Sequence, residues 1–422
     1  MKVSAPRNAP AGSRSRDGEE RTEAARQQNQ RYADFFPIAS AVAAAILAAL
    51  AIFHVVRTLR RLSERYALYD FAAYYKWGRQ YQGGLEWWAR SHCNYTPFFV
   101  AGFAPLTRID PRWLHPGWQI FQLACLIAAM ILVARSAGVF SARAIVVLAA
   151  ASVLSRTSDQ VLFFGQFAPM LLLLMVGSWM LASARRDAGS ALLLALAILL
   201  KLYPGILLGY YLVCGKWRVL IWTAVFFALG VFATGFENWR GFIVYGLPHS
   251  GEILARGFWR DRVSIFNLVW GLEAMIASPS WWTVFAPAAA VSLVLVVAAA
   301  LETVAARARS LDGIYFSLWL ALGLLLAPIA WHHEIVLLFP LYFFGALCGL
   351  RIVREAELTT YARVGFFAIA IAMLLVLAGR EYAALFKNLL PTYLVPICAF
   401  IAGLILAEEQ RPEIAGRGKV VR

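Results

Sequence analysis

One carboxylate, Asp70, stands in an aromatic segment near the start of the chain, in a setting suited to acid–base chemistry. The segment reads ERYALYDFAAYYKWGRQY over residues 64–81. Its spacing predicts a helix with Asp70, Tyr74, Trp77 and Tyr81 on one face. An acid without an adjacent acid is too little for a metal site but sufficient for a general base. The rings suit either stacking on sugars or anchoring at a membrane boundary, where Tyr and Trp are common.

Three further polar groups stand inside or beside apolar runs. They are Gln166 in FFGQFAPM, Lys201 in KLYP, and the pair His332 and His333 in WHHE. A buried glutamine either joins helices or contacts a substrate, and a lone lysine either extends toward the membrane surface or binds a phosphate. Adjacent histidines face different sides of a helix, which favours a proton or phosphate partner for one of them. No cysteine or third histidine lies at ligand spacing, so the sequence does not support a zinc site.

The segment NYTPFFVAGFAPL, residues 94–106, leads from the first polar region into an apolar run. Pro97 and Pro105 mark breaks in regular helix. Two interpretations stay open for the segment, a hinge between a surface helix and a span or a direct contact with a ligand.

Membrane-spanning helices must position these polar segments. The 422-residue chain is 61% hydrophobic and 15% charged, with a mean hydropathy of +0.65, and apolar runs of about 18 or more residues recur along it. The net charge of +15 does not indicate nucleic acid, because Lys and Arg cluster in the connections between apolar runs, as cytoplasmic loops do. We predict an all-α integral membrane protein with about twelve transmembrane helices, in apolar segments at 37–57, 117–135, 143–154, 161–183, 188–200, 203–214, 217–235, 283–303, 313–329, 334–350, 361–378 and 390–407.

Polar tails are expected to flank one transmembrane domain. Residues 1–33 are predicted to be a disordered cytoplasmic tail, residues 34–408 the membrane domain and residues 409–422 a second cytoplasmic tail. The segment 189–214 admits either one broken helix or two short helices. The basic connections ARRD and GKWR on either side of it favour two crossings, with Lys201 near the outer surface.

The same charge bias places three polar regions on the outer side. They are the loop 58–115, the loop 236–282 and the turn 327–334. Although the first loop is itself basic, long loops follow the charge bias weakly, and a basic outer loop suits an anionic ligand. We therefore predict that the active site lies on these outer-surface loops.

Motifs of nucleotide chemistry are missing from the sequence. It contains no P-loop, no GxGxxG after a strand, no DxD pair and no HExxH. These absences argue against an ATP-driven pump and against a nucleotide-sugar with a metal-bound diphosphate. The five cysteines offer no disulfide framework, because all but Cys93 lie in apolar segments.

Taken together, these stretches resemble the GT-C glycosyltransferases of family 87 (GT87, DUF2029), which includes polyprenol-phosphate-mannose-dependent mannosyltransferases of bacterial envelopes. The resemblance runs from about residue 37 to 345. This chain has Thr96-Pro97-Phe98 where the family usually has a sequence closer to Tyr-Pro-Pro. The matching positions are Tyr69-Asp70-Phe71 with Tyr74, Tyr95-x-Pro97, Gly165-Gln166, Lys201-x-Tyr203-Pro204 and Pro328-x-x-Trp331-His332-His333.

The resemblance implies an inverting hexosyltransferase that uses a polyprenyl-phosphate sugar, with mannose as the expected sugar. Asp70 resembles the family's catalytic carboxylate and would be the general base. The donor phosphate or its proton relay would fall to His332, His333 and Lys201. The residues expected to bind sugar or acceptor are Tyr69, Tyr74, Trp77, Tyr95, Gln166 and Trp331.

The same resemblance implies the protein's partners and location. The partners would be membrane lipids, the lipid-linked donor and a glycan or glycolipid acceptor, with no metal, no cofactor and no nucleic acid. The active site would face the exterior of a bacterial inner membrane. Two alternatives are a flippase or transporter of a lipid-linked saccharide and a scaffold subunit. A transporter would require charged groups near mid-membrane and an internal repeat, and a scaffold would leave Asp70 replaceable.

Overall fold

The computed structural model describes residues 41–42, 44–60, 69–250, 264–266, 269–270, 281–306, 312–327 and 330–344. The chain divides into two compact units, Met1–Ile46 and Leu47–Arg422. Of the first unit, residues 41–42 and 44–46 are described, and all are helical. The predicted tails and the predicted spans at 361–378 and 390–407 lie outside the described residues.

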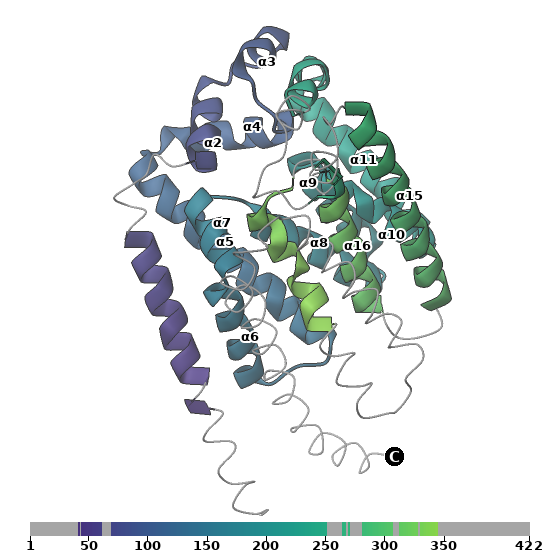
Figure 1. The fold of residues 1–422 in the computed structure, drawn as a ribbon. Helices are drawn as coiled ribbons and strands as arrows, with labels where there is room; N and C mark the ends of the chain where they lie inside the picture. The colour runs from purple at the N-terminus through teal and green to yellow at the C-terminus, as the bar shows by residue number, and fades with distance from the viewer. Residues whose placement is uncertain are drawn as a thin grey trace, which may run out of the picture. The chain divides into compact units, whose positions relative to one another are not determined.

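Within its described residues the second unit is built from helices, as predicted (Figure 1). After a helix that continues to residue 60, the helices are α2 (Tyr69–Gln80), α3 (Leu85–Ser91), α4 (Pro97–Phe103), η1 (Ala104–Arg108), α5 (Pro111–Ser136), α6 (Ala142–Leu154), α7 (Arg156–Phe164), α8 (Ala168–Ser183), α9 (Asp187–Leu200), η2 (Tyr203–Gly205), α10 (Ile206–Val213), α11 (Trp217–Thr234), α12 (Phe236–Gly241), η3 (Phe242–Gly246), α15 (Trp281–Ala306), α16 (Asp312–Leu326) and η4 (His332–Leu338).

Three of the described helices are long and apolar enough to cross a bilayer. These helices are α5, α11 and α15, and α6 with α7 makes a fourth if that pair, bent by 58°, is one span. Side chains of α11 and α15 such as Ile221, Phe232 and Leu293 are exposed, as lipid contact would require. Other predicted spans coincide with shorter apolar helices, so the described residues support a membrane protein without establishing twelve crossings.

The ambiguous segment 189–214 forms two helices with a break at Lys201. Lys201 is extended, with φ −155° and ψ 138°, after α9 ends. A hydrogen bond of 3.2 Å from Lys216 Nζ to Ala182 O places the connection after α10 beside the end of α8. Since the 14 residues of α9 rise about 21 Å, the chain runs away from that end and returns. Lys201 therefore lies at the opposite end of this helix pair from the ARRD and GKWR connections.

The predicted loop 58–115 is largely helical. It contains α2, α3, α4 and η1 before α5 starts at Pro111, and α2, α3 and α4 lie close together at the top of Figure 1. Proline at the first turn of α4 and of α5 suits a helix start, because the missing N–H would have no partner there. The break in regular helix predicted at Pro97 is confirmed, because α4 begins there, and both interpretations of residues 94–106 stay predictions.

The second predicted loop packs against the first. Asn238 of α12 accepts a hydrogen bond of 2.7 Å from the Gly84 N–H, and Phe242 stacks edge-on against Trp88 of α3, with ring centroids 5.7 Å apart. The remainder of the loop is outside the described residues, apart from 264–266 and 269–270.

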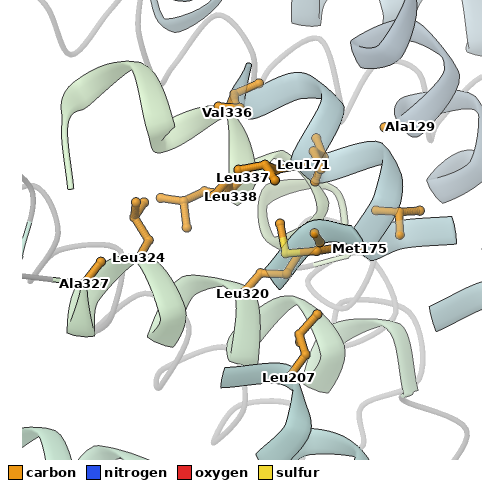
Figure 2. Packing of buried hydrophobic residues seen from close by; sticks show 14 of the residues in the cluster. Ala129, Leu171, Met175, Leu207, Leu320, Leu324, Ala327, Val336, Leu337 and Leu338 are labelled. Atoms are coloured by element: carbon orange, nitrogen blue, oxygen red, sulfur yellow. The ribbon is translucent and has the colours of Figure 1, made fainter. Parts of the chain in front are cut away.

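A buried apolar core holds the polar turn in place. Figure 2 shows Val336, Leu337 and Leu338 of η4 among buried side chains of α8 and α16, including Leu171 and Leu320. All five side chains are at most 2% exposed. Close van der Waals packing is what holds helices together inside a membrane, so the segment after the histidine pair is firmly packed.

Candidate active site

Asp70 lies in the first turn of α2 and is partly buried. Its carboxylate accepts a hydrogen bond from the side-chain amide of Gln166, which is distant in sequence. Burial raises the pKa of Asp70 above its usual value of 3.8, although the bond from Gln166 and the positive charge of Lys201 act in the opposite direction. A carboxylate whose pKa is raised is a stronger base than an ordinary carboxylate, which suits a general base.

Two tyrosines fix the orientation of Gln166. The Tyr74 hydroxyl donates to Gln166 Oε1 at 3.0 Å, and the hydroxyls of Tyr74 and Tyr95 are 3.0 Å apart. A phenol has one proton, so Tyr95 must donate to Tyr74 while Tyr74 donates to Gln166. The amide nitrogen of Gln166 is thereby directed at Asp70. Burial raises the pKa of both tyrosines well above 10, so they remain protonated donors.

Side chains of α5 hold the turn that carries Gln166. Trp118 Nε1 donates to Gly165 O at 2.8 Å, Gln119 donates to Leu162 O, and Gln122 Oε1 accepts the Met170 N–H at 3.2 Å. Together they satisfy backbone groups at the end of α7 and the start of α8. The position of Gln166 is therefore set by the α5 helix behind it.

Gly165 is required at this turn for two reasons. Its φ of +75° ends α7 in the left-handed region, and a methyl group there would lie 2.6 Å from Cβ of Phe71, the neighbour of Asp70. Gly138→Ala is a matched control, because Gly138 has φ +78° and open space around it. We expect Gly138→Ala to lower the unfolding free energy by about 1–2 kcal/mol and Gly165→Ala by a further 1–3 kcal/mol or so, measured by unfolding in detergent. Equal losses would show that Phe71 does not constrain Gly165.

Lys201 and Glu334 form an ion pair beside this network. The side chain of Glu334 is 1% exposed and that of Lys201 is 21% exposed. Glu334 also accepts the Trp331 N–H at 3.1 Å, which fixes the start of η4. The Lys201 ammonium lies 5.9 Å from the ring centroids of Tyr95 and Phe167 and 5.3 Å from that of Tyr203, where cation–π attraction holds it.

Aromatic rings line the space between these polar groups. Tyr95 lies 5.0 Å from Tyr74, 5.1 Å from Phe99 and 5.7 Å from Trp77, measured between ring centroids. Tyr74 is 1% exposed, whereas Tyr95 and Trp77 are half-buried. Tyr95 and Trp77 are thus better placed than Tyr74 to contact a sugar.

The structure brings most of the predicted site residues together. Asp70, Tyr74, Tyr95 and Gln166 share one hydrogen-bond network, and Lys201 contacts Tyr95. Trp331 is half-buried at the start of the polar turn. For Tyr69, His332 and His333 the backbone is helical, and their side chains lie outside the described residues.

Glu334 is a site residue that the sequence predictions do not include. The available signal was the pairing of one acid in an apolar run with one lysine in another, since ionisable groups inside a membrane usually have a partner. Among the described residues no group of three or more His, Cys, Asp or Glu side chains could hold a metal ion.

The model of glycosyltransferase family 87 matches residues 94–331, more than half of the chain. The match includes Tyr95, Gln166 and Lys201 and ends at Trp331, whereas Asp70 and Glu334 lie outside it. The comparison with curated proteins gave no match.

Proposed function

Because the chain belongs to glycosyltransferase family 87, we propose that it transfers a hexose from a polyprenyl-phosphate donor to a lipid-linked or envelope glycan, with mannose as the first sugar to test. The observation that carries the proposal is the carboxylate of Asp70, which accepts a hydrogen bond from Gln166 and lies near aromatic rings and a lysine. One base is sufficient when the leaving group is already a phosphate.

The reaction begins with proton transfer. Asp70 takes the proton of the acceptor hydroxyl, and the oxygen forms a bond to the anomeric carbon of the donor sugar. The bond from that carbon to the phosphate oxygen breaks on the opposite face, and the electron pair leaves with polyprenyl phosphate. The phosphate changes from a diester with one negative charge to a monoester, and neutral Asp70 then returns its proton to solvent.

The remaining groups supply charge and shape. Lys201, with His332 and His333, is proposed to stabilise the charge that grows on the phosphate. Tyr95, Trp77, Tyr69 and Trp331 are proposed to stack on or bind the sugars. Gln166 and Tyr74, whose polar groups bond within the protein, are assigned to holding Asp70.

Donor use tests this proposal directly. Purified protein in liposomes should transfer sugar from a polyprenyl-phosphate hexose, without added divalent metal, and should leave the matching nucleotide-sugar unused. Product formation is followed by mass spectrometry of the lipid fraction. Transfer that required manganese and a nucleotide-sugar would rule the proposal out.

The effect of the Gln166 hydrogen bond on Asp70 should be visible in the pH dependence of kcat/KM. This bond lowers the pKa of Asp70, so its loss in Gln166→Leu raises that pKa further. A base works only when deprotonated, and the acidic limb of the kcat/KM profile should therefore move to higher pH in this variant. Gln80→Leu, on the exposed end of α2, is the control with an unchanged limb. If the acidic limb does not move in Gln166→Leu, Gln166 does not influence the pKa of the catalytic base.

We propose further that the site faces the exterior of a bacterial inner membrane. Glu86 on α3 is exposed near the site, and Arg186 is exposed at the end of α9 opposite Lys201. In a background without the native cysteines, Glu86→Cys should react with an impermeant maleimide outside intact cells. Arg186→Cys should react only after permeabilisation. The reverse pattern would place the site in the cytoplasm.

A further inference from the structure

Glu334 is a buried acid that the proposed reaction does not use. One carboxylate oxygen pairs with Lys201 and the other accepts the Trp331 N–H. The backbone N–H of Glu334 in turn donates to Trp331 O at 2.9 Å. These bonds hold the carboxylate firmly in place beside the ammonium group.

A phosphate on Lys201 would therefore share the ammonium with Glu334. The Lys201 ammonium also lies near the rings of Tyr95, Phe167 and Tyr203, which add no formal charge. Two oxygen anions bonded to one ammonium nitrogen lie within about 4–5 Å of each other. At that separation in a partly buried site, each added negative charge is strongly repelled.

The charge of the donor and that of the product differ. The donor phosphate is a diester with one negative charge, whereas polyprenyl phosphate is a monoester whose second pKa is about 6. At pH 8 the product therefore carries close to two negative charges. Repulsion by the Glu334 carboxylate grows in proportion to the charge on the phosphate, so it disfavours the doubly charged product about twice as strongly as the singly charged donor.

We propose that Glu334 is a specificity-determining residue that disfavours the doubly charged lipid phosphate and so promotes product release. The inference rests on the proposed function, with Lys201 at the donor phosphate. It predicts weak product inhibition in the wild type and strong product inhibition when Glu334 is neutral.

The test compares two inhibitors of the transfer reaction at pH 8. A short-chain polyprenyl phosphate carries about two charges, and its methyl ester carries one. In Glu334→Gln, the glutamine oxygen can still accept the Trp331 N–H. The inhibition constant of polyprenyl phosphate should fall about tenfold or more, and that of the methyl ester should fall much less. Glu237→Gln is the control, because Glu237 is an exposed acid paired with Arg240, and neither constant should change.

If Glu334→Gln does not fold, the role of Glu334 is tested by comparing how tightly the wild type binds the two inhibitors. The wild type should bind the methyl ester more tightly than the doubly charged monoester at pH 8. Tighter binding of the monoester, or an equal change in both constants in Glu334→Gln, would overturn the role of Glu334. Both of these outcomes require a wild-type protein that transfers sugar. If the proposed function itself were wrong, the wild type would not use a polyprenyl-phosphate donor at all, so the two failures can be told apart.

Discussion

Replacing Asp70 with asparagine is expected to lower kcat by at least about a hundredfold, the smaller end of the range for loss of a general base. Asparagine keeps the size of the side chain and can still accept the hydrogen bond from Gln166, but it cannot take a proton at neutral pH. Binding of the donor, measured by titration with the lipid-linked sugar, should remain within a few-fold of the wild type.

The same change should not destabilise the protein. Burial raises the pKa of Asp70 in the folded state, so the protonated carboxyl group contributes to stability fully below its usual pKa of 3.8, and this contribution is lost as the pH rises through the folded pKa. At neutral pH the uncharged Asn variant should unfold at the same temperature as the wild type or at a higher one. Activity lost together with stability would point to misfolding.

Asp187→Asn provides the matched control for this experiment. Asp187 is in the first turn of α9, at the opposite end of that helix from Lys201, and its replacement should leave turnover unchanged. Full activity in Asp70→Asn would remove Asp70 from the mechanism.

Replacing Lys201 with methionine is expected to have the largest effect on stability. The change leaves the Glu334 carboxylate, 1% exposed, without its cation. Removing one partner of a buried ion pair typically costs about 3–5 kcal/mol. The loss should appear as a lower midpoint of chemical unfolding in detergent.

The double variant Lys201→Met with Glu334→Gln separates this effect from simple loss of packing. Replacing both charges by uncharged groups of similar size is often close to neutral for stability, so the double variant should recover most of the loss. Turnover with the lipid-linked donor should stay low, because the cation for the phosphate is still missing. If the single and the double variant unfold at the same denaturant concentration, the loss of stability does not come from leaving the Glu334 charge unpaired.

The sequence predicted local features of the site well. The spacing of Asp70, Tyr74 and Trp77 predicted the α2 helix, and the structure confirms that helix over Tyr69–Gln80. The family resemblance is also confirmed, by the match over residues 94–331. The α2 helix and the family resemblance were both predicted from residues that lie close together in the sequence, where spacing and short motifs can be read directly.

Contacts between distant segments were harder to foresee. The sequence leaves open whether Gln166 joins helices or contacts a substrate, and the bonds of its amide to Asp70 and Tyr74 could not be foreseen, because nothing in the sequence states that α7 ends beside α2. The predicted loop 58–115 contains helices too polar or too short to register as apolar runs. Glu334 was missed because its partner Lys201 is far away in sequence.

The anomeric configuration of the product is the most direct test of the central claim, that one carboxylate drives a single displacement at the donor sugar. A single base on the acceptor side gives one attack opposite the phosphate and therefore inversion, whereas retention requires a nucleophile and a second displacement. The coupling constants of the transferred sugar are to be measured by NMR on product made from a donor of defined configuration. The account predicts an inverted anomeric centre, and a retained configuration would contradict it.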